Sequence, residues 1–121
     1  MKKVLIVDDQ VEVRELVEVT LSMHGYHILH AEDGTTAFEI VKAEKPDLTI
    51  MDVMMPNGIN GLEATRLIKT NDETKHCKVI MLTARGQEPD IEEGYAAGAD
   101  DYFVKPFSPL QLIRKVEEFL A

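Results

Sequence analysis

The sequence predicts an α/β fold, a three-layer α/β/α sandwich in which helices cover both faces of a five-stranded parallel sheet. Two observations lead to this prediction. Short apolar runs alternate with segments of helical periodicity along the whole chain, and the runs are rich in β-branched and aromatic residues, as buried parallel strands are. Strict alternation requires right-handed crossovers, which place helices above and below the sheet.

Five segments have the length and composition of strands. They are Val4 to Val7, His27 to Ala31, Leu48 to Met51, Val79 to Leu82 and Tyr102 to Val104. None approaches the ~18 consecutive apolar residues of a membrane span, and the apolar run near Met1 is too short for a signal peptide. We therefore expect no membrane association and a cytoplasmic location.

The first two helices are predicted from apolar spacing and from the residues at their ends. The first follows Asp9 and ends near Gly25. The second follows the turn Asp33-Gly34 and stops before Pro46, because the residue before a proline resists helical torsions. Their predicted apolar faces are Val13, Leu16, Val17, Thr20 and Leu21 in the first helix and Ala37, Phe38, Val41 and Ala43 in the second.

The other three helices are predicted mainly from their capping residues. Asn60 and Glu63 have capping-box spacing before a helix from Gly61 to about Lys69. Pro89 suits the first turn of the fourth helix, and Gly98 suits the left-handed position after its end. Ser108-Pro109 with Gln111 begins the fifth. Buried residues are predicted to be Leu62, Thr65 and Ile68 in the third helix and Leu112, Val116 and Phe119 or Leu120 in the fifth.

Length and charge limit the classes of function. A chain of 121 residues fits one domain, residues 1–121, with one real core. Its 13 Lys and Arg against 22 Asp and Glu give a net charge of −9, which disfavours nucleic acid or an anionic membrane as a direct partner. The single cysteine, Cys77, cannot form an intrachain disulfide and has no partners for a zinc site.

Five polar side chains stand where predicted strands end. They are Asp8, Asp9, Asp52, Thr83 and Lys105. Because the carboxyl ends of parallel strands share one edge of a sheet, these groups are expected to lie together, at the edge where open α/β sheets bind ligands. Three clustered carboxylates repel one another unless a cation compensates, and oxygen ligands without sulfur or imidazole favour Mg²⁺, with Mn²⁺ as the second candidate.

Each of these residues also has an ordinary structural interpretation. Asp9 with Glu12 has the spacing of a helix N-cap, and Asp52 precedes a turn-forming segment. Thr83 suits an N-cap, and Lys105 suits an exposed loop position. No single residue decides between these interpretations, but together the residues at four strand ends favour a site.

With these residues in these positions, the chain resembles the receiver domain of two-component response regulators. The motifs that carry the resemblance are Val7-Asp8-Asp9, Met51-Asp52-Val53-Met54-Met55-Pro56, Leu82-Thr83-Ala84 and Lys105-Pro106-Phe107, supported by Ala97 to Tyr102. They occur in the receiver order and span the whole chain. The resemblance implies the flavodoxin-like strand order 2-1-3-4-5, for which a receiver protein is a standard example.

The resemblance also implies a role for each site residue. Asp52 would accept a phosphoryl group from a histidine kinase or phosphotransfer protein, forming an acyl phosphate. Asp8 and Asp9, with Asp52 and the carbonyl of Met54, would hold Mg²⁺. Lys105 and Thr83 would bind the phosphoryl oxygens, and a cis peptide bond is expected between Lys105 and Pro106. Such a domain is not an enzyme in the ordinary sense, because it catalyses only its own phosphorylation and dephosphorylation.

A signalling surface and two departures follow from the same resemblance. Tyr102 would act with Thr83 as the switch, although an aromatic ring that merely fills the sheet edge is the alternative. The fourth helix, fifth strand and fifth helix would then bind an output domain or a partner protein. Gln111 and Glu117 depart from the charge pattern of receivers that dimerise through this face, so we expect a monomer or weak dimer. Compared with the pattern of the family, the segment Asn57-Gly58-Ile59 contains one additional residue, close to the carbonyl of Met54.

Three alternative functions remain open at this stage. A phosphatase of the haloacid-dehalogenase type would require a second Asp two residues after the nucleophile, where Met54 stands. Flavin binding on the same fold would require a hydroxyl- and glycine-rich loop after the first strand, where Asp8-Asp9-Gln10 would repel phosphate. A non-phosphorylated interaction module is disfavoured because all five site residues are present.

Overall fold

The computed structural model describes residues 1–121 and contains one five-stranded sheet. The strands are β1 Lys3–Val7, β2 His27–Ala31, β3 Leu48–Met51, β4 Lys78–Thr83 and β5 Asp101–Val104. They lie in the order β2-β1-β3-β4-β5, and each neighbouring pair is parallel. The predicted fold class and strand order are confirmed. Three strands begin one residue earlier than predicted, and β4 also ends one residue later.

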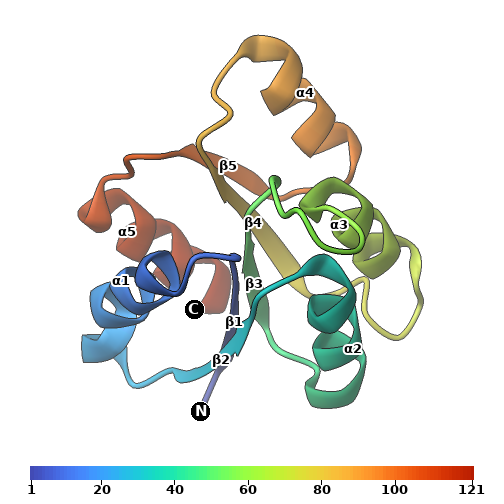
Figure 1. The fold of residues 1–121 in the computed structure, drawn as a ribbon. Coiled ribbons are helices and arrows are strands. Elements are labelled where there is room, and N and C mark those ends of the chain that lie inside the picture. Colours follow the sequence, from blue (N-terminus) through green and yellow to red (C-terminus); the bar gives the residue numbers. More distant parts are fainter.

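Helices cover both faces of the sheet, as Figure 1 shows. They are α1 Val11–Leu21, α2 Gly34–Glu44, α3 Gly61–Thr70, α4 Glu88–Ala96 and α5 Pro109–Leu120, with a short 3-10 turn, η1 Ser22–His24, after α1. Helices α1 and α5 lie on one face, and α2 and α3 lie on the other. None of these helices has the length and apolar character that crossing a membrane requires.

Apolar residues fill the interface on each side of the sheet. In β1, Val4 and Ile6 pack on the side of α1 and α5, whereas Leu5 and Val7 pack on the side of α2 and α3. All four are at most 1% exposed. A strand buried on both faces has no polar alternation, which explains why the sequence shows continuous apolar runs.

Two residues of the predicted helix faces lie elsewhere, so these predictions were wrong. Leu16 is 54% exposed, because it lies about 100° around α1 from its buried neighbour Val17. Ala43 is exposed for the same reason, since it lies about 200° around α2 from buried Val41. The helical period decides which residues face the sheet, and both errors came from widening the apolar face beyond it.

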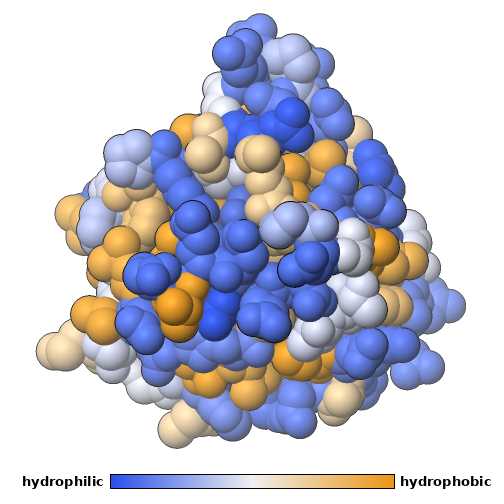
Figure 2. All heavy atoms as spheres, viewed as in Figure 1, coloured by the Kyte–Doolittle hydropathy of each residue, from blue (hydrophilic) through white to orange (hydrophobic).

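The predicted helix ends are confirmed in their main features. The side chain of Asn60 accepts a hydrogen bond from the Glu63 N–H at 2.9 Å, and the Ser108 hydroxyl accepts one from the Gln111 N–H at 3.3 Å. Gly98 follows α4 with a φ of 110°. Helix α4 itself buries one residue, Gly94, and extends outward beside β5. In the same view, hydrophilic residues cover most of α4 and the centre of this face (Figure 2).

Candidate metal and phosphoryl-transfer site

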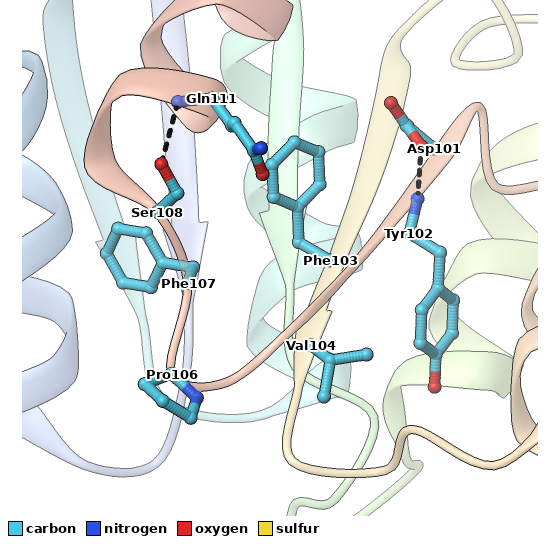
Figure 3. A pocket seen from close by; sticks show the side chains of 8 residues that line it. All are labelled: Asp101, Tyr102, Phe103, Val104, Pro106, Phe107, Ser108 and Gln111. Carbon is cyan, nitrogen blue, oxygen red and sulfur yellow. Dashed lines mark hydrogen bonds between the residues drawn. The ribbon is translucent and has the colours of Figure 1, made fainter.

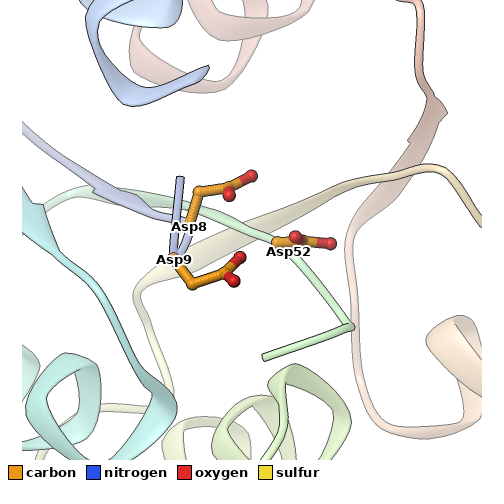
Figure 4. Close-up of side chains that lie close together, drawn as sticks. All are labelled: Asp8, Asp9 and Asp52. Carbon is orange, nitrogen blue, oxygen red and sulfur yellow. The ribbon is translucent and has the colours of Figure 1, made fainter. Parts of the chain in front are cut away.

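The structure brings the five predicted site residues to one edge of the sheet. Asp8 and Asp9 follow β1, Asp52 follows β3, Thr83 ends β4, and Lys105 follows β5. Oxygen atoms of the three carboxylates lie within 4.8 Å of one another. Figure 4 shows the three side chains gathered at the ends of their strands.

Backbone hydrogen bonds place these residues by continuing the parallel ladder past the strand ends. The Asp8 N–H donates to the Ala31 carbonyl at 3.1 Å, and the Asp52 N–H donates to the Val7 carbonyl at 3.0 Å. The Lys105 N–H donates to the Thr83 carbonyl at 2.8 Å. Neighbouring strands therefore fix the height of each side chain, and the site depends on sheet register rather than on a flexible loop.

Asp8 is the most extensively bonded of the three acids. Its Oδ1 accepts from the Gln10 N–H at 2.9 Å, and its Oδ2 lies 2.7 Å from the Lys105 Nζ. Arg14, which the sequence reading overlooked, donates from Nη1 to the Asp8 carbonyl at 2.6 Å. Asp9 is exposed, and the N-cap of α1 is Gln10, so the interpretation of Asp9 as a helix cap was wrong.

The charges at this edge do not balance. Lys105 is the one ammonium close to the acids, 2.7 Å from Asp8 Oδ2 and 3.5 Å from Asp52 Oδ2, against three carboxylates. The side chains of Asp8 and Asp52 are only 4% and 8% exposed. Burial raises the pKa of Asp52, and the nearby Asp8 carboxylate raises it further, while Lys105 partly opposes both.

This excess of negative charge fits a divalent cation. All three ligands offered are carboxylate oxygens, and one of them, on Asp9, faces solvent, from which an ion and its waters can enter. Hard cations such as Mg²⁺ prefer oxygen ligands and retain several waters. The donor set therefore matches Mg²⁺ on charge, ligand type and access.

Thr83 and Lys105 do not have the ordinary roles considered above. Thr83 is completely buried, and α4 begins only at Glu88, so Thr83 is not a helix N-cap. Its hydroxyl accepts weakly from the Arg85 N–H at 3.4 Å. Lys105 is part-buried and ion-paired, with a side chain that is 21% exposed. Its peptide bond to Pro106 is cis.

Asp52 lies in a turn as well as in the acidic cluster. Its Oδ1 accepts from the Met54 N–H at 3.3 Å, which agrees with the turn interpretation. Met54 itself is 57% exposed, whereas Asp52 is buried. Gly61, at the start of α3, packs so closely on Asp52 that an added Cβ would collide with its carbonyl oxygen. The sequence reading used Gly61 only as a helix start and missed this contact.

Tyr102 connects β5 to the loop before α4. Its ring is half-buried, and its hydroxyl donates to the Arg85 carbonyl at 2.6 Å. A Cβ added at Gly94 would lie 2.7 Å from ring atoms of Tyr102, so this glycine lets α4 approach the ring. Burial raises the pKa of the Tyr102 phenol, with a contribution from Asp90, and keeps it a hydrogen-bond donor.

A pocket of about 410 Å³ lies between β5 and the start of α5. Phe103 and Phe107 line it together with Gln111, and Tyr102 points to the other side of the strand, as Figure 3 shows. Tyr102 is among the lining residues, whereas Asp8, Asp9 and Asp52 are not. The pocket is a feature of the surface formed by α4, β5 and α5.

Comparisons with known proteins agree with the motifs. The model of the response regulator receiver domain family matches residues 4–117. The phosphate regulon transcriptional regulatory protein PhoB of Pseudomonas aeruginosa is 42% identical over 119 residues, which are 98% of this chain and 52% of that protein.

Solved structures give the same result. The chemotaxis protein CheY4 of Vibrio cholerae is 34% identical with a TM-score of 0.89, and the alignment covers 98% of each chain. The BeF3-activated receiver domain of DrrB is 32% identical with a TM-score of 0.88, covering 99% of this chain and 97% of that one. The chain spans about half the length of the curated relatives it matches.

Proposed function

Because this chain belongs to the response regulator receiver domain family, we propose that residues 1–121 form a phosphoacceptor domain with Asp52 as its acceptor. Receiver domains are signalling domains of two-component systems, and a histidine kinase or phosphotransfer protein is the proposed donor. The observation that carries the proposal is the position of Asp52, a buried carboxylate within 3.5 Å of Lys105 and beside two further acids.

The proposed reaction is a direct phosphoryl transfer. One carboxylate oxygen of Asp52 forms a bond to phosphorus while the phosphorus–nitrogen bond to the donor histidine breaks, and the bonding electron pair returns to that nitrogen. Phosphoryl transfer depends mainly on positioning and on neutralising charge on the equatorial oxygens. In this proposal Lys105 gives an ammonium to one of these oxygens, and Thr83 donates its hydroxyl to another.

A bound Mg²⁺ would neutralise charge between the acids and the phosphoryl group. Asp8, Asp9 and Asp52 are the proposed ligands, with the carbonyl of Met54 as a fourth; Mn²⁺ is the second candidate. The contribution of the chain itself is to hold three carboxylates together at a cost in repulsion, which a bound hard cation would relieve.

The proposed output runs through Thr83 and Tyr102. A dianionic group on Asp52 attracts the Thr83 hydroxyl, and movement of the loop that contains Arg85 disturbs the hydrogen bond that holds the Tyr102 ring. The surface of α4, β5 and α5 would then bind an output domain or a partner protein. The proposal includes a cytoplasmic location, a monomer or weak dimer, and no direct contact with nucleic acid, which the net charge of −9 favours.

Labelling with a small phosphodonor tests the acceptor. In Mg²⁺ buffer with acetyl phosphate or phosphoramidate, the protein is expected to gain the mass of one phosphoryl group, and Asp52→Asn is expected to gain none. Asp72→Asn, in an exposed loop with its side chain 92% exposed, is the matched control and should label like the parent. Undiminished labelling of Asp52→Asn would show that another residue is the acceptor.

We further propose that the acyl phosphate is long-lived. Met54 and Arg85 flank the site, and Met54 has no amide or carboxylate to orient an attacking water. After removal of the donor, phosphorylated protein should persist well beyond seconds in Mg²⁺ buffer. Complete loss within seconds would contradict this proposal without affecting the assignment of Asp52.

A further inference from the structure

The loop between β3 and α3 leans on the first turn of α2. An ideal Cβ built on Gly34 would lie 2.5 Å from the Ile59 carbonyl oxygen, 2.9 Å from Ile59 Cγ1 and 3.1 Å from the Asn60 carbonyl oxygen. Real Cβ atoms do not approach backbone oxygens so closely. The backbone of this loop therefore occupies space that is available only because residue 34 lacks a side chain.

Space, rather than backbone torsion, requires glycine at this position. Gly34 is the first residue of α2, and its φ lies outside the left-handed region, unlike those of Gly25 and Gly58. Any L-residue could adopt this torsion, and Asp33 already caps the helix through the Thr36 N–H at 2.7 Å. The first turn of α2 would form equally well with alanine, so the glycine serves the neighbouring loop.

Other contacts hold the same loop at both ends. Ile59 packs against the core cluster on the α2 and α3 side, and a Cβ on Gly58 would lie 2.9 Å from the Thr35 hydroxyl oxygen. At the far end, Gly61 abuts the Asp52 backbone and donates its N–H to the Val53 carbonyl at 3.0 Å. The segment Asn57-Gly58-Ile59 of this loop is therefore seated against the first turn of α2.

We propose that Gly34 is a positioning residue for the metal-binding loop. By admitting the Ile59 carbonyl, it lets residues 53–60 hold Met54 beside Asp52, so that α2 tunes the affinity for the cation without touching it. The inference rests on the proposed function, because it assumes that Met54 and Asp52 lie in a Mg²⁺ site. Groups that orient metal ligands from outside commonly change metal affinity by about 10-fold or more when altered.

The test is Mg²⁺ affinity of the unphosphorylated protein, measured by titration calorimetry. Gly34→Ala is expected to bind Mg²⁺ about 10-fold more weakly than the parent, because the loop must move away from the new methyl group. Gly25→Ala is the matched control. The φ of 71° at Gly25 makes the substitution strained, but no atom lies within 4 Å of the added Cβ. Gly25 also precedes β2, at the amino ends of the strands and away from the acids. The control variant should lose stability and keep its Mg²⁺ affinity.

A second variant covers the case in which Gly34→Ala does not fold. Ile59→Ala removes the side chain that seats the loop and is also expected to weaken Mg²⁺ binding. If both act through one contact, their effects on affinity should be non-additive in the double variant. If Gly34→Ala folds and binds Mg²⁺ as tightly as the parent, the inference about Gly34 is wrong, but the proposed metal site stands. If Gly34→Ala does not fold, parent-like Mg²⁺ affinity in Ile59→Ala has the same meaning. Absence of Mg²⁺ binding by the parent would overturn the proposed metal site as well.

Discussion

Two part-buried lysine–aspartate pairs stand at opposite edges of the sheet, and they differ in how their charges are balanced. At the amino edge, Lys69 Nζ donates to Asp100 Oδ2 and to the Cys77 carbonyl, both at 2.9 Å, and Asp100 Oδ2 also accepts from the Val79 N–H at 2.8 Å. At the carboxyl edge, Lys105 Nζ lies 2.7 Å from Asp8 Oδ2 and 3.5 Å from Asp52 Oδ2, so one ammonium is shared by two carboxylates.

The first pair has one charge of each sign, whereas at the second one ammonium faces three carboxylates and the Arg14 guanidinium binds only the Asp8 main chain. A balanced, hydrogen-bonded and part-buried pair stabilises the fold, since removing one partner leaves a charge without its partner. An unbalanced cluster costs stability and is retained where it binds or reacts. Similar burial of the two lysines, with side chains 17% and 21% exposed, means that this difference comes from the number of acids.

The largest effect is expected at the balanced pair. Asp100→Ala removes the carboxylate that accepts hydrogen bonds from the Lys69 ammonium and the Val79 N–H. We expect this substitution to lower the free energy of unfolding by about 3 kcal/mol. Urea denaturation measures this loss. Phosphorylation of the folded variant at low temperature should match that of the parent. A loss below about 1 kcal/mol would show that the pair is not structural.

Metal binding should relieve the electrostatic repulsion among Asp8, Asp9 and Asp52 and so stabilise the folded protein. With Mg²⁺ at about 100 times its dissociation constant, the parent is expected to gain about 2.7 kcal/mol, because the ion binds only the folded state. Asp8→Asn should remove most of this gain, and Asp100→Asn should retain it. Thermal melting with Mg²⁺ and with EDTA gives both values, and an equal gain in the two variants would exclude Asp8 from the site.

Without metal, removing a carboxylate from the cluster should stabilise the protein. Asp52→Asn in EDTA at neutral pH is expected to gain about 1 kcal/mol, the scale on which functional sites cost stability. The pKa of Asp52 is raised in the folded state, so its ionisation disfavours folding as pH rises through that folded value. The gain should therefore be present at neutral pH and disappear below about pH 4, where the carboxyl is protonated in both states. A gain that does not change with pH would point to packing instead.

These pairs also show how far sequence reasoning reached. Asp8, Asp52, Thr83 and Lys105 were predictable as a group because each follows an apolar run, and strand ends meet at one edge. The contact between Gly34 and Ile59 was not predictable, because helix packing brings these residues together and neither residue type suggests a partner. Similarly, no spacing rule joins Lys69 to Asp100.

The smallest effect is expected at an exposed pair that resembles the others in distance alone. Lys75 Nζ lies 3.0 Å from Asp72 Oδ1, as close as Lys69 lies to Asp100, but the two side chains are 59% and 92% exposed. Water solvates both charges in the folded and unfolded states, so Asp72→Asn should change stability by less than about 0.5 kcal/mol. Urea denaturation of Asp72→Asn and Asp100→Asn under the same conditions compares their losses in free energy of unfolding directly. If the two variants lose equal stability, pairing distance rather than burial governs these interactions, and the contrast between the balanced and unbalanced pairs loses its physical basis.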